Sequence, residues 1–487
     1  MFPFNISLDK SKFSLDASGI AGAFGGDEAI SAMATVHLFK GRRWWGWYNS
    51  PGSYIVGKRF GQLANSRFWD GLFPGPNVDP AVMFELDGKV GPKFVGAHSG
   101  TVIKRTTQLA YLLSERCKDL PVEKLKGRVT RPQRVTIVEL EDIAHDKPLP
   151  TMSVNATLLA CIPTLVSAVT CIACAFTRDW YSFSMILLGI VSSGIAYLVL
   201  GSGVLRVDPV KEHAPGVPPG DGILLGEEIV ILKGKEGSVS FVTKGKFVLD
   251  MAGRHAKTGP KRIEDRYIPE TRQDKVAGRT DHVGIRVVEQ EIQEDTHSEY
   301  RSIGLCSLLL VMQFISQLLL VPQGTLFGQI MFLLSLAVSW AYNSFLSSLE
   351  KNKIQADILH EFLNKPSMKR YELKSRTATA VFVVLVLQPA NPMKILNQFL
   401  PNDTAVWNRW KELVVHKILQ HEKLRFDETE WPQNAIELSE GEQRLLRTLL
   451  RDANAAWEGY ISYRPGKFAD DLLVKNIISS DNEYDLE

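Results

Sequence analysis

Four long apolar stretches interrupt a sequence that is otherwise rich in polar and charged residues. Residues 154–176, 181–200, 303–321 and 326–345 each run without a single Asp, Glu, Lys or Arg. A helix of about twenty such residues crosses a hydrocarbon core roughly 30 Å thick. The pattern therefore predicts a multipass α-helical membrane protein with four transmembrane helices in two hairpins and α+β cytosolic segments.

Very short connectors join these stretches in pairs. Residues 177–180 link the first pair and residues 322–324 link the second, so each pair must turn straight back, and both connectors must lie on one side of the membrane. The connectors offer only Arg178, whereas the other ends are flanked by Lys147, Arg206, Lys211, Arg286, Arg301, Lys351 and Lys353. Because basic loops stay in the cytosol, we expect an integral membrane protein with both termini cytosolic. The pattern does not distinguish an endomembrane from the plasma membrane.

The two hairpins divide the chain into five parts. We expect a cytosolic α/β region (1–152), a transmembrane hairpin (153–203), a cytosolic loop with a small β meander (204–302), a second transmembrane hairpin (303–346), and a cytosolic C-terminal region that is mainly helical with a buried strand (347–487).

Within the first region, Asp87-Gly88 is a hairpin turn signal. It predicts strands at 82–86 and 89–95, and the sequence further predicts a helix at 101–117 and a strand at 134–139. In the central loop, Lys-Gly turns separate three apolar runs that predict the meander, at 229–232, 238–243 and 246–249.

The C-terminal region begins with residues 347–363, which are expected to continue the fourth apolar helix into the cytosol. The valine-rich run 380–387 is too short to cross a bilayer and suits a strand buried on both faces. Residues 404–420 predict an amphipathic helix. A second helix is predicted from the capping pattern at Ser439 towards Tyr460.

Polar residues inside the third and fourth apolar stretches fall on single helical faces. Gln313 and Gln317 are four residues apart, and Ser335, Ser339 and Asn343 continue the same spacing. An unpaired amide or hydroxyl is costly in hydrocarbon. These faces should therefore meet each other as packing contacts, line a polar conduit, or meet another subunit.

Residues 40–48 combine cations with large aromatic rings. Arg42, Arg43, Trp44, Trp45 and Trp47 form a candidate membrane-surface contact, since such pairs suit anionic headgroups. The alternative is a folded loop whose tryptophans close the N-terminal core. Nucleic acid is not an expected partner, because the formal net charge is only +2.

Catalytic and metal-binding patterns are missing from the sequence. None of the short signatures of phosphate loops, nucleophile elbows, zinc proteases or EF-hands is present. Four of the five cysteines fall inside the apolar stretches, where they behave as small hydrophobic residues. We therefore assign no catalytic residue, no metal ligand and no cofactor, and we favour a non-enzymatic role.

These observations favour a membrane-anchored scaffold or accessory protein that acts through cytosolic protein or lipid contacts. The expected partners are the lipid bilayer and either a second copy of the chain or a cytosolic protein. A passive channel or transporter is the first alternative, with the polar residues of the third and fourth stretches along its route. A membrane-shaping hairpin protein is the other alternative.

Overall fold

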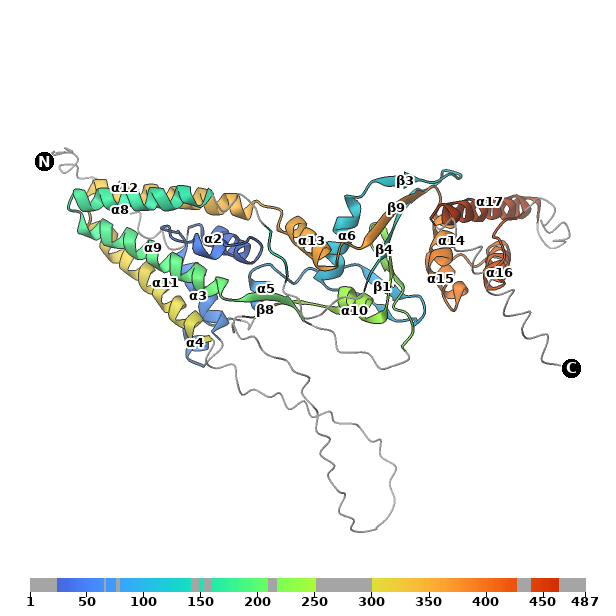
Figure 1. Ribbon diagram of the computed structural model, residues 1–487, viewed down its shortest axis with the longest axis horizontal. Coiled ribbons are helices and arrows are strands. Elements are labelled where there is room, and N and C mark those ends of the chain that lie inside the picture. The colour runs from blue at the N-terminus through green and yellow to red at the C-terminus, as the bar shows by residue number, and fades with distance from the viewer. Residues whose placement is uncertain are drawn as a thin grey trace, which may run out of the picture.

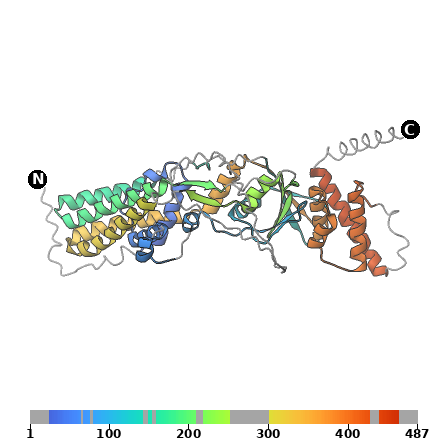
Figure 2. The same ribbon diagram turned by 90° about the horizontal axis from the view of Figure 1, so that it is seen from below.

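The computed structural model describes residues 24–64, 67–75, 79–141, 149–152, 159–208, 217–250, 300–426 and 439–463. Within these residues the protein is mostly helical, with one large mixed sheet. The molecule is elongated: apolar helices form one end, the sheet lies in the middle, and the C-terminal helices form the other end (Figure 1 and Figure 2).

A bundle of four apolar helices forms the first end. Its helices are α8 (Cys161–Phe176), α9 (Trp180–Gly201), α11 (Tyr300–Leu320) and α12 (Leu326–Ser347), and the turn η4 (Val321–Gln323) joins the last two. Three segments, Trp180–Gly201, Ser302–Gln323 and Leu326–Ser347, are long and apolar enough to cross a membrane. α8 has 16 residues, and most of the predicted start of its stretch lies outside the described residues.

The two hairpins pack on each other helix by helix. α8 lies against α12, and α9 lies against α11. The α8–α12 pair and the α9–α11 pair meet at the connectors and diverge towards the sheet (Figure 1). The space between the diverging helices is filled by the N-terminal part of the chain.

That N-terminal part consists of short helices and turns: α2 (Gly26–Ala34), η2 (Thr35–His37), η3 (Arg42–Trp44), α3 (Ser53–Leu63) and α4 (Arg67–Leu72). α2 packs against α12, and α3 packs against α11. Small residues allow this close approach, since a side chain at Gly57 would press on Leu310 and Val311. Residues 24–64 are therefore built into the helix bundle.

The central sheet has seven strands in the order β2-β1-β6-β7-β4-β9-β3. The strands are β1 (Lys93–Gly96), β2 (Val102–Ile103), β3 (Val122–Lys124), β4 (Gln133–Glu139), β6 (Gly222–Leu225), β7 (Ile229–Lys233) and β9 (Ser367–Leu373). β4 runs parallel to β7 and antiparallel to β9. A separate pair joins β5 (Val204–Val207) to β8 (Phe247–Asp250).

Both faces of the sheet are buried, so alternate residues of one strand enter different cores. In β7, Val230 and Leu232 join a core that extends into the helix bundle, whereas Ile229 and Ile231 join a second core. The first face is covered by α6 (Gln108–Lys118), α10 (Glu236–Lys244) and α13 (Lys351–Phe362), and the short α5 (Pro80–Met83) lies between the sheet and the bundle. The second face is covered by α14 (Arg376–Leu387), followed by α15 (Pro392–Phe399), α16 (Ala405–Leu419) and α17 (Glu440–Tyr463).

Several predicted elements are confirmed. The strands at 134–139 and 229–232 are β4 and β7, and the helix at 404–420 is α16. The capping pattern also forms: the Ser439 backbone N–H donates to the Glu442 carboxylate, and the Glu442 N–H donates to the Ser439 hydroxyl. In these segments either apolar residues recur at a regular spacing or a capping pattern marks the start of the helix.

The predicted buried strand at 380–387 is wrong, because these residues belong to helix α14. Ser375 caps the helix by accepting a hydrogen bond from the Ala378 N–H. The helix is buried on every side, between the sheet and α17. A helix buried all round has no polar face, so its sequence looks like that of a buried strand.

The predicted strand at 238–243 is likewise wrong, since it lies in α10 with all six residues buried. The described residues of the central loop therefore form no three-stranded meander: β7 pairs with β6, and β8 pairs with β5. The hairpin predicted around Asp87-Gly88 is also absent, because Asp79 caps helix α5 and β1 pairs with β6 and β2.

Two predicted helices have different bounds in the structure. The helix expected over 101–117 begins only at Gln108, because Val102–Ile103 forms strand β2. The helix expected over 347–363 is interrupted after Ser347, and α13 starts anew at Lys351.

Candidate functional site: a polar segment inside the helix bundle

Residues 40–50, here called the inserted segment, run beside α9 in a groove of small residues. Arg43 lies at Gly201, Trp47 at Gly194 and Asn49 at Gly189, and a Cβ at any of these glycines would overlap its neighbour. The partners on α9 are separated by twelve helical residues, or about 18 Å along its axis. The segment therefore reaches from the end of α9 to beyond its midpoint.

Most of the inserted segment is not helical, so its polar groups need partners other than a helix ladder. The Asn49 N–H donates to the Ser167 hydroxyl of α8 over 3.0 Å. The Asn49 side-chain amide donates to the Ser335 hydroxyl of α12 over 2.8 Å. One residue of the segment thus bridges the two hairpins through side chains that lie within apolar helices.

A second group of contacts centres on the buried Tyr48 hydroxyl. It donates to Asn343 Oδ1 over 2.8 Å and lies 2.8 Å from the Tyr197 hydroxyl. A phenol has only one proton to donate, so Tyr48 accepts from Tyr197. Asn343 in turn donates to the Ser50 hydroxyl over 3.1 Å. The network joins the segment to α9 and α12.

Arg42 is the charged member of this network, and it is only 1% exposed. One guanidinium nitrogen donates to the Trp45 carbonyl over 2.7 Å. Its Cζ lies 4.7 Å from the ring centroid of Tyr197 and 5.3 Å from that of Tyr342. Among the described residues no carboxylate pairs with it, so aromatic faces and neutral oxygens surround this cation.

The five residues predicted to touch a membrane surface have different environments. Arg42 is buried, Trp45 and Trp47 are partly buried, and Arg43 and Trp44 are exposed. The segment therefore places two of the five side chains on the surface and uses the others for packing inside the bundle.

The two polar rows of the apolar helices have different partners. In the α12 row, Ser335 and Asn343 bond to the inserted segment, and no described residue bonds to the Ser339 hydroxyl. In the α11 row, Gln313 and Gln317 are both 1% exposed, and one amide atom of each has no partner in the part of the chain that the structure describes. Within the described residues no hydrogen bond joins the rows.

Asp179 connects the hairpins at the opposite end of the bundle. Its carboxylate caps α9 by accepting from the Ser182 N–H and hydroxyl. It also accepts from the Thr325 N–H and hydroxyl, both over 2.8 Å. Thr325 itself caps α12, so the two connectors meet at one carboxylate.

Sequence reasoning missed the roles of Tyr48, Asn49, Tyr197 and Asp179. Asp179 carried a usable signal, because an acidic residue directly before an apolar helix is a capping residue. Gly189, Gly194 and Gly201 were a weaker signal, since small residues in a transmembrane helix mark a close contact without naming the partner.

A separate pocket of about 210 Å³ lies among the C-terminal helices. Its walls are mainly apolar and aromatic, and its titratable members are His421, Glu422 and Tyr460. Elsewhere in the part of the chain that the structure describes, no group of three or more His, Cys, Asp or Glu side chains could hold a metal ion.

The contacts in the bundle site therefore attach the inserted segment to the apolar helices. The guanidinium group of Arg42 lies among aromatic rings. Hydrogen bonds connect the N-terminal segment to both hairpins. Comparison with known proteins gives no match: no family model, no curated protein and no solved structure is similar to this chain.

Proposed function

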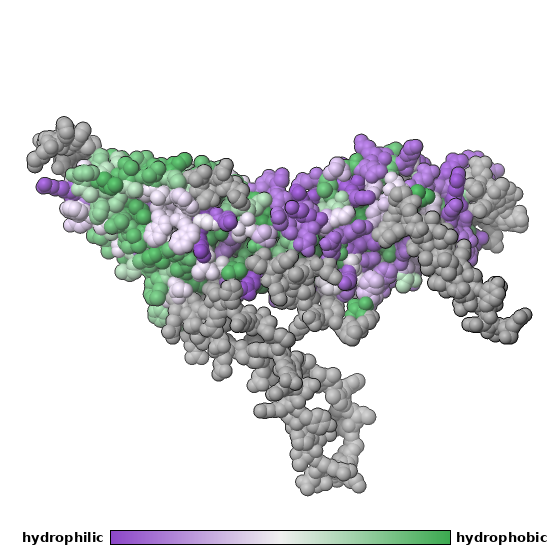
Figure 3. All heavy atoms as spheres, viewed as in Figure 1, coloured by the Kyte–Doolittle hydropathy of each residue, from purple (hydrophilic) through white to green (hydrophobic). Residues whose placement is uncertain are grey.

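We propose that the protein is a membrane-anchored scaffold, with four helices crossing the bilayer and an elongated module held at the cytosolic face. One observation carries the proposal. Large apolar side chains are exposed on all four helices of the bundle and are here called the belt. On the face drawn in Figure 3, the bundle is mainly apolar, whereas the sheet and the C-terminal helices are mainly polar. The belt includes Ile162, Leu165, Val169, Ile172, Phe176, Leu187, Leu305, Met312, Leu319, Ile330 and Leu334.

A surface of this kind needs an apolar solvent, because soluble proteins rarely expose large contiguous apolar patches. α8 contributes to the belt as fully as the three longer helices do. Its outward residues Ile162, Leu165 and Val169 are 54%, 62% and 63% exposed. This supports a fourth crossing, although α8 itself is shorter.

Charge supports the orientation. The connector end exposes Arg178, whereas Lys40, Arg43, Lys58 and Arg59 are exposed on the N-terminal part that fills the other end. Under the positive-inside rule the connectors lie outside the cytosol, and the sheet and C-terminal helices lie within it.

The attachment between anchor and module supports the scaffold role. One hydrophobic core runs without interruption from Tyr197 and Leu346 in the bundle to Val230 and Leu232 in the sheet. Lys351 at the start of α13 adds polar contacts to Ser31 of α2 and to Glu85. A partner bound to the module would therefore be held at a fixed height and orientation above the membrane.

Topology can be tested with single cysteines and a membrane-impermeant maleimide, in a variant that lacks the five native cysteines. We expect Thr177→Cys and Gln323→Cys to react only from the extracytosolic side. Ser99→Cys and Arg444→Cys should react only after the cytosolic side is opened. Labelling of connector and module positions from the same side would contradict the proposal.

The scaffold role itself requires a partner at the module. A photo-reactive amino acid at Arg409 or Arg444, both exposed on the C-terminal helices, should give discrete protein adducts in intact cells. The same group at Ile172, which faces lipid, serves as the matched control. Adducts that are no more frequent at the module than at Ile172 would argue against a scaffold.

A passive channel is the second candidate, because no described residue forms a hydrogen bond with Gln313 Oε1, Gln317 Nε2 or the Ser339 hydroxyl, all of which are buried. Such atoms would be available to a permeating species if several chains assembled. Ion and solute flux in proteoliposomes separates the candidates. We expect no flux above that of protein-free vesicles, and flux that falls in Gln313→Leu would favour the channel.

A further inference from the structure

Three exposed residues form a patch where the inserted segment leaves the bundle. Lys40, Arg43 and Trp44, here called the rim patch, are all exposed, and Trp44 is 57% exposed. The Arg43 guanidinium carbon lies 5.0 Å from the centroid of the Trp44 ring. Within the described residues no carboxylate lies within ion-pairing distance of Lys40 or Arg43.

The position of the rim patch along the bundle follows from its contact with α9. Arg43 lies directly against Gly201, the last residue of that helix. α9 begins at Trp180, and its 22 residues span about 33 Å, close to the thickness of a hydrocarbon core. Trp180 and Tyr181 are 62% and 50% exposed at the connector end. The rim patch and this aromatic pair therefore lie at the two boundaries of one membrane-sized helix.

The local backbone holds the patch outward. Gly41 adopts a left-handed conformation with φ 75°, and η3 follows it directly. Within η3, Arg42 turns into the bundle and is fixed there by Trp45 and the two tyrosine rings. Its neighbour Arg43 is exposed and lies against Gly201. The buried arginine thus positions the exposed pair without being part of the patch.

We propose that the rim patch binds the headgroup of an anionic phospholipid in the cytosolic leaflet. Lys40 and Arg43 contact the phosphate or carboxylate oxygens, and the Trp44 ring lies at the boundary between headgroups and acyl chains. An amphipathic ring beside cations is suited to that boundary. The inference rests on the proposed membrane placement and adds a lipid preference to it.

The test uses the full-length protein reconstituted into vesicles with brominated lipids, which quench nearby tryptophans. The Trp44 contribution is the difference between the wild type and Trp44→Phe. We expect brominated phosphatidylserine to quench Trp44 more strongly than the same fraction of brominated phosphatidylcholine. Each cation should raise the local preference for phosphatidylserine over phosphatidylcholine about fivefold. The double variant Lys40→Gln with Arg43→Gln should therefore abolish this preference.

Arg178→Gln is the matched control, because it removes an exposed cation at the connector end, and it should leave the Trp44 signal unchanged. Equal quenching by both lipids in the wild type would overturn the proposal, as would a serine-lipid preference that survives in the double variant. Absence of Trp44 quenching by either lipid would instead contradict the membrane placement itself. The two failures are therefore distinguishable.

Discussion

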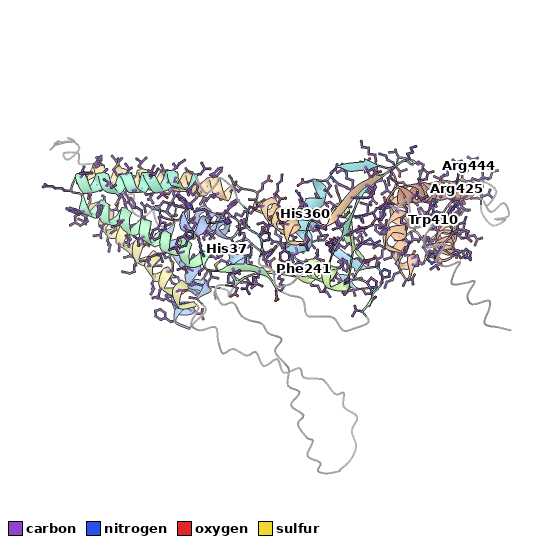
Figure 4. All side chains as sticks on the ribbon, viewed as in Figure 1. His37, Phe241, His360, Trp410, Arg425 and Arg444 are labelled. Atoms are coloured by element: carbon purple, nitrogen blue, oxygen red, sulfur yellow. The ribbon has the colours of Figure 1, made fainter. Side chains whose placement is uncertain are left out.

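Two buried residues of the N-terminal part show how this bundle accommodates polar groups. Arg42 keeps its charge among tyrosine rings and oxygens, and about 2 kcal/mol is typical of a desolvated cation over an aromatic ring. His37 is 8% exposed, and no described residue forms a hydrogen bond with its Nε2. Figure 4 shows His37 near the end of α9, against which η2 packs.

Burial lowers the pKa of the His37 imidazole to about 4, from 6.5 in an exposed chain. The unfolded protein therefore binds more protons between these two values, and stability must fall as pH falls through this window. The full contribution of the neutral His37 imidazole to the free energy of unfolding is present above pH 6.5 and amounts to roughly 3 kcal/mol. We expect the midpoint of thermal unfolding in detergent to drop between pH 7 and pH 4.5, and the drop to be smaller in His37→Gln.

His416 provides the control for this experiment, because it lies on the C-terminal helix α16, and its ring contacts the exposed Gln420 side chain. His416→Gln removes an exposed imidazole and is measured beside His37→Gln over the same pH range. Parallel pH profiles for His37→Gln and the wild type would show that the imidazole does not titrate with unfolding.

At the scale of elements, α9 is adapted to a non-helical neighbour. Its glycines would weaken an isolated helix, yet each one contacts the inserted segment. Ala is a better helix former than Gly by about 1 kcal/mol, so propensity alone predicts that Gly194→Ala stabilises the protein. Because its Cβ would overlap the Trp47 ring, we expect a loss of about 1–3 kcal/mol instead.

Gly441→Ala in α17 is the matched substitution, since a Cβ there meets nothing within 4 Å. It should leave stability unchanged or raise it slightly. Chemical denaturation of both variants measures the contrast, and stabilisation by Gly194→Ala would mean that the groove is looser than described.

The elements show what the sequence could and could not predict. The length of the charge-free stretches located the apolar helices. The spacing of apolar residues or a capping pattern located β4, β7, α16 and α17. The errors at 380–387 and 238–243 arise because both segments are helices whose every residue is buried, which removes the amphipathic signal. Within the site, the Ser335 and Asn343 row was visible in the sequence. Its partner was not, because Tyr48 and Asn49 lie nearly 300 residues earlier.

At the scale of the whole molecule, the hairpins are connected at one end by Asp179 and at the other by the inserted segment. Asp179→Asn keeps the size of the side chain but replaces one acceptor oxygen by an amide group. Hydrogen bonds to a charged group contribute about 1.5–3 kcal/mol each. We therefore expect thermal unfolding to show that the free energy of unfolding falls by at least about 1.5 kcal/mol.

Asp208→Asn is the control for Asp179→Asn, because Asp208 is exposed just beyond β5. It removes the same charge without breaking a contact between hairpins. Equal stability of the two variants would show that the connectors dock through other groups.

The inserted segment also constrains how the chain is made. Residues 40–50 are synthesised well before their partners on α12, which are complete only when synthesis reaches Asn343. At the usual pace of translation, about 5–20 residues per second, the wait is on the order of tens of seconds. During that interval the side chains of Tyr48 and Asn49 lack their hydrogen-bond partners on α12, so the newly made chain must keep its N-terminal part from aggregating until the last helix of the bundle has been made.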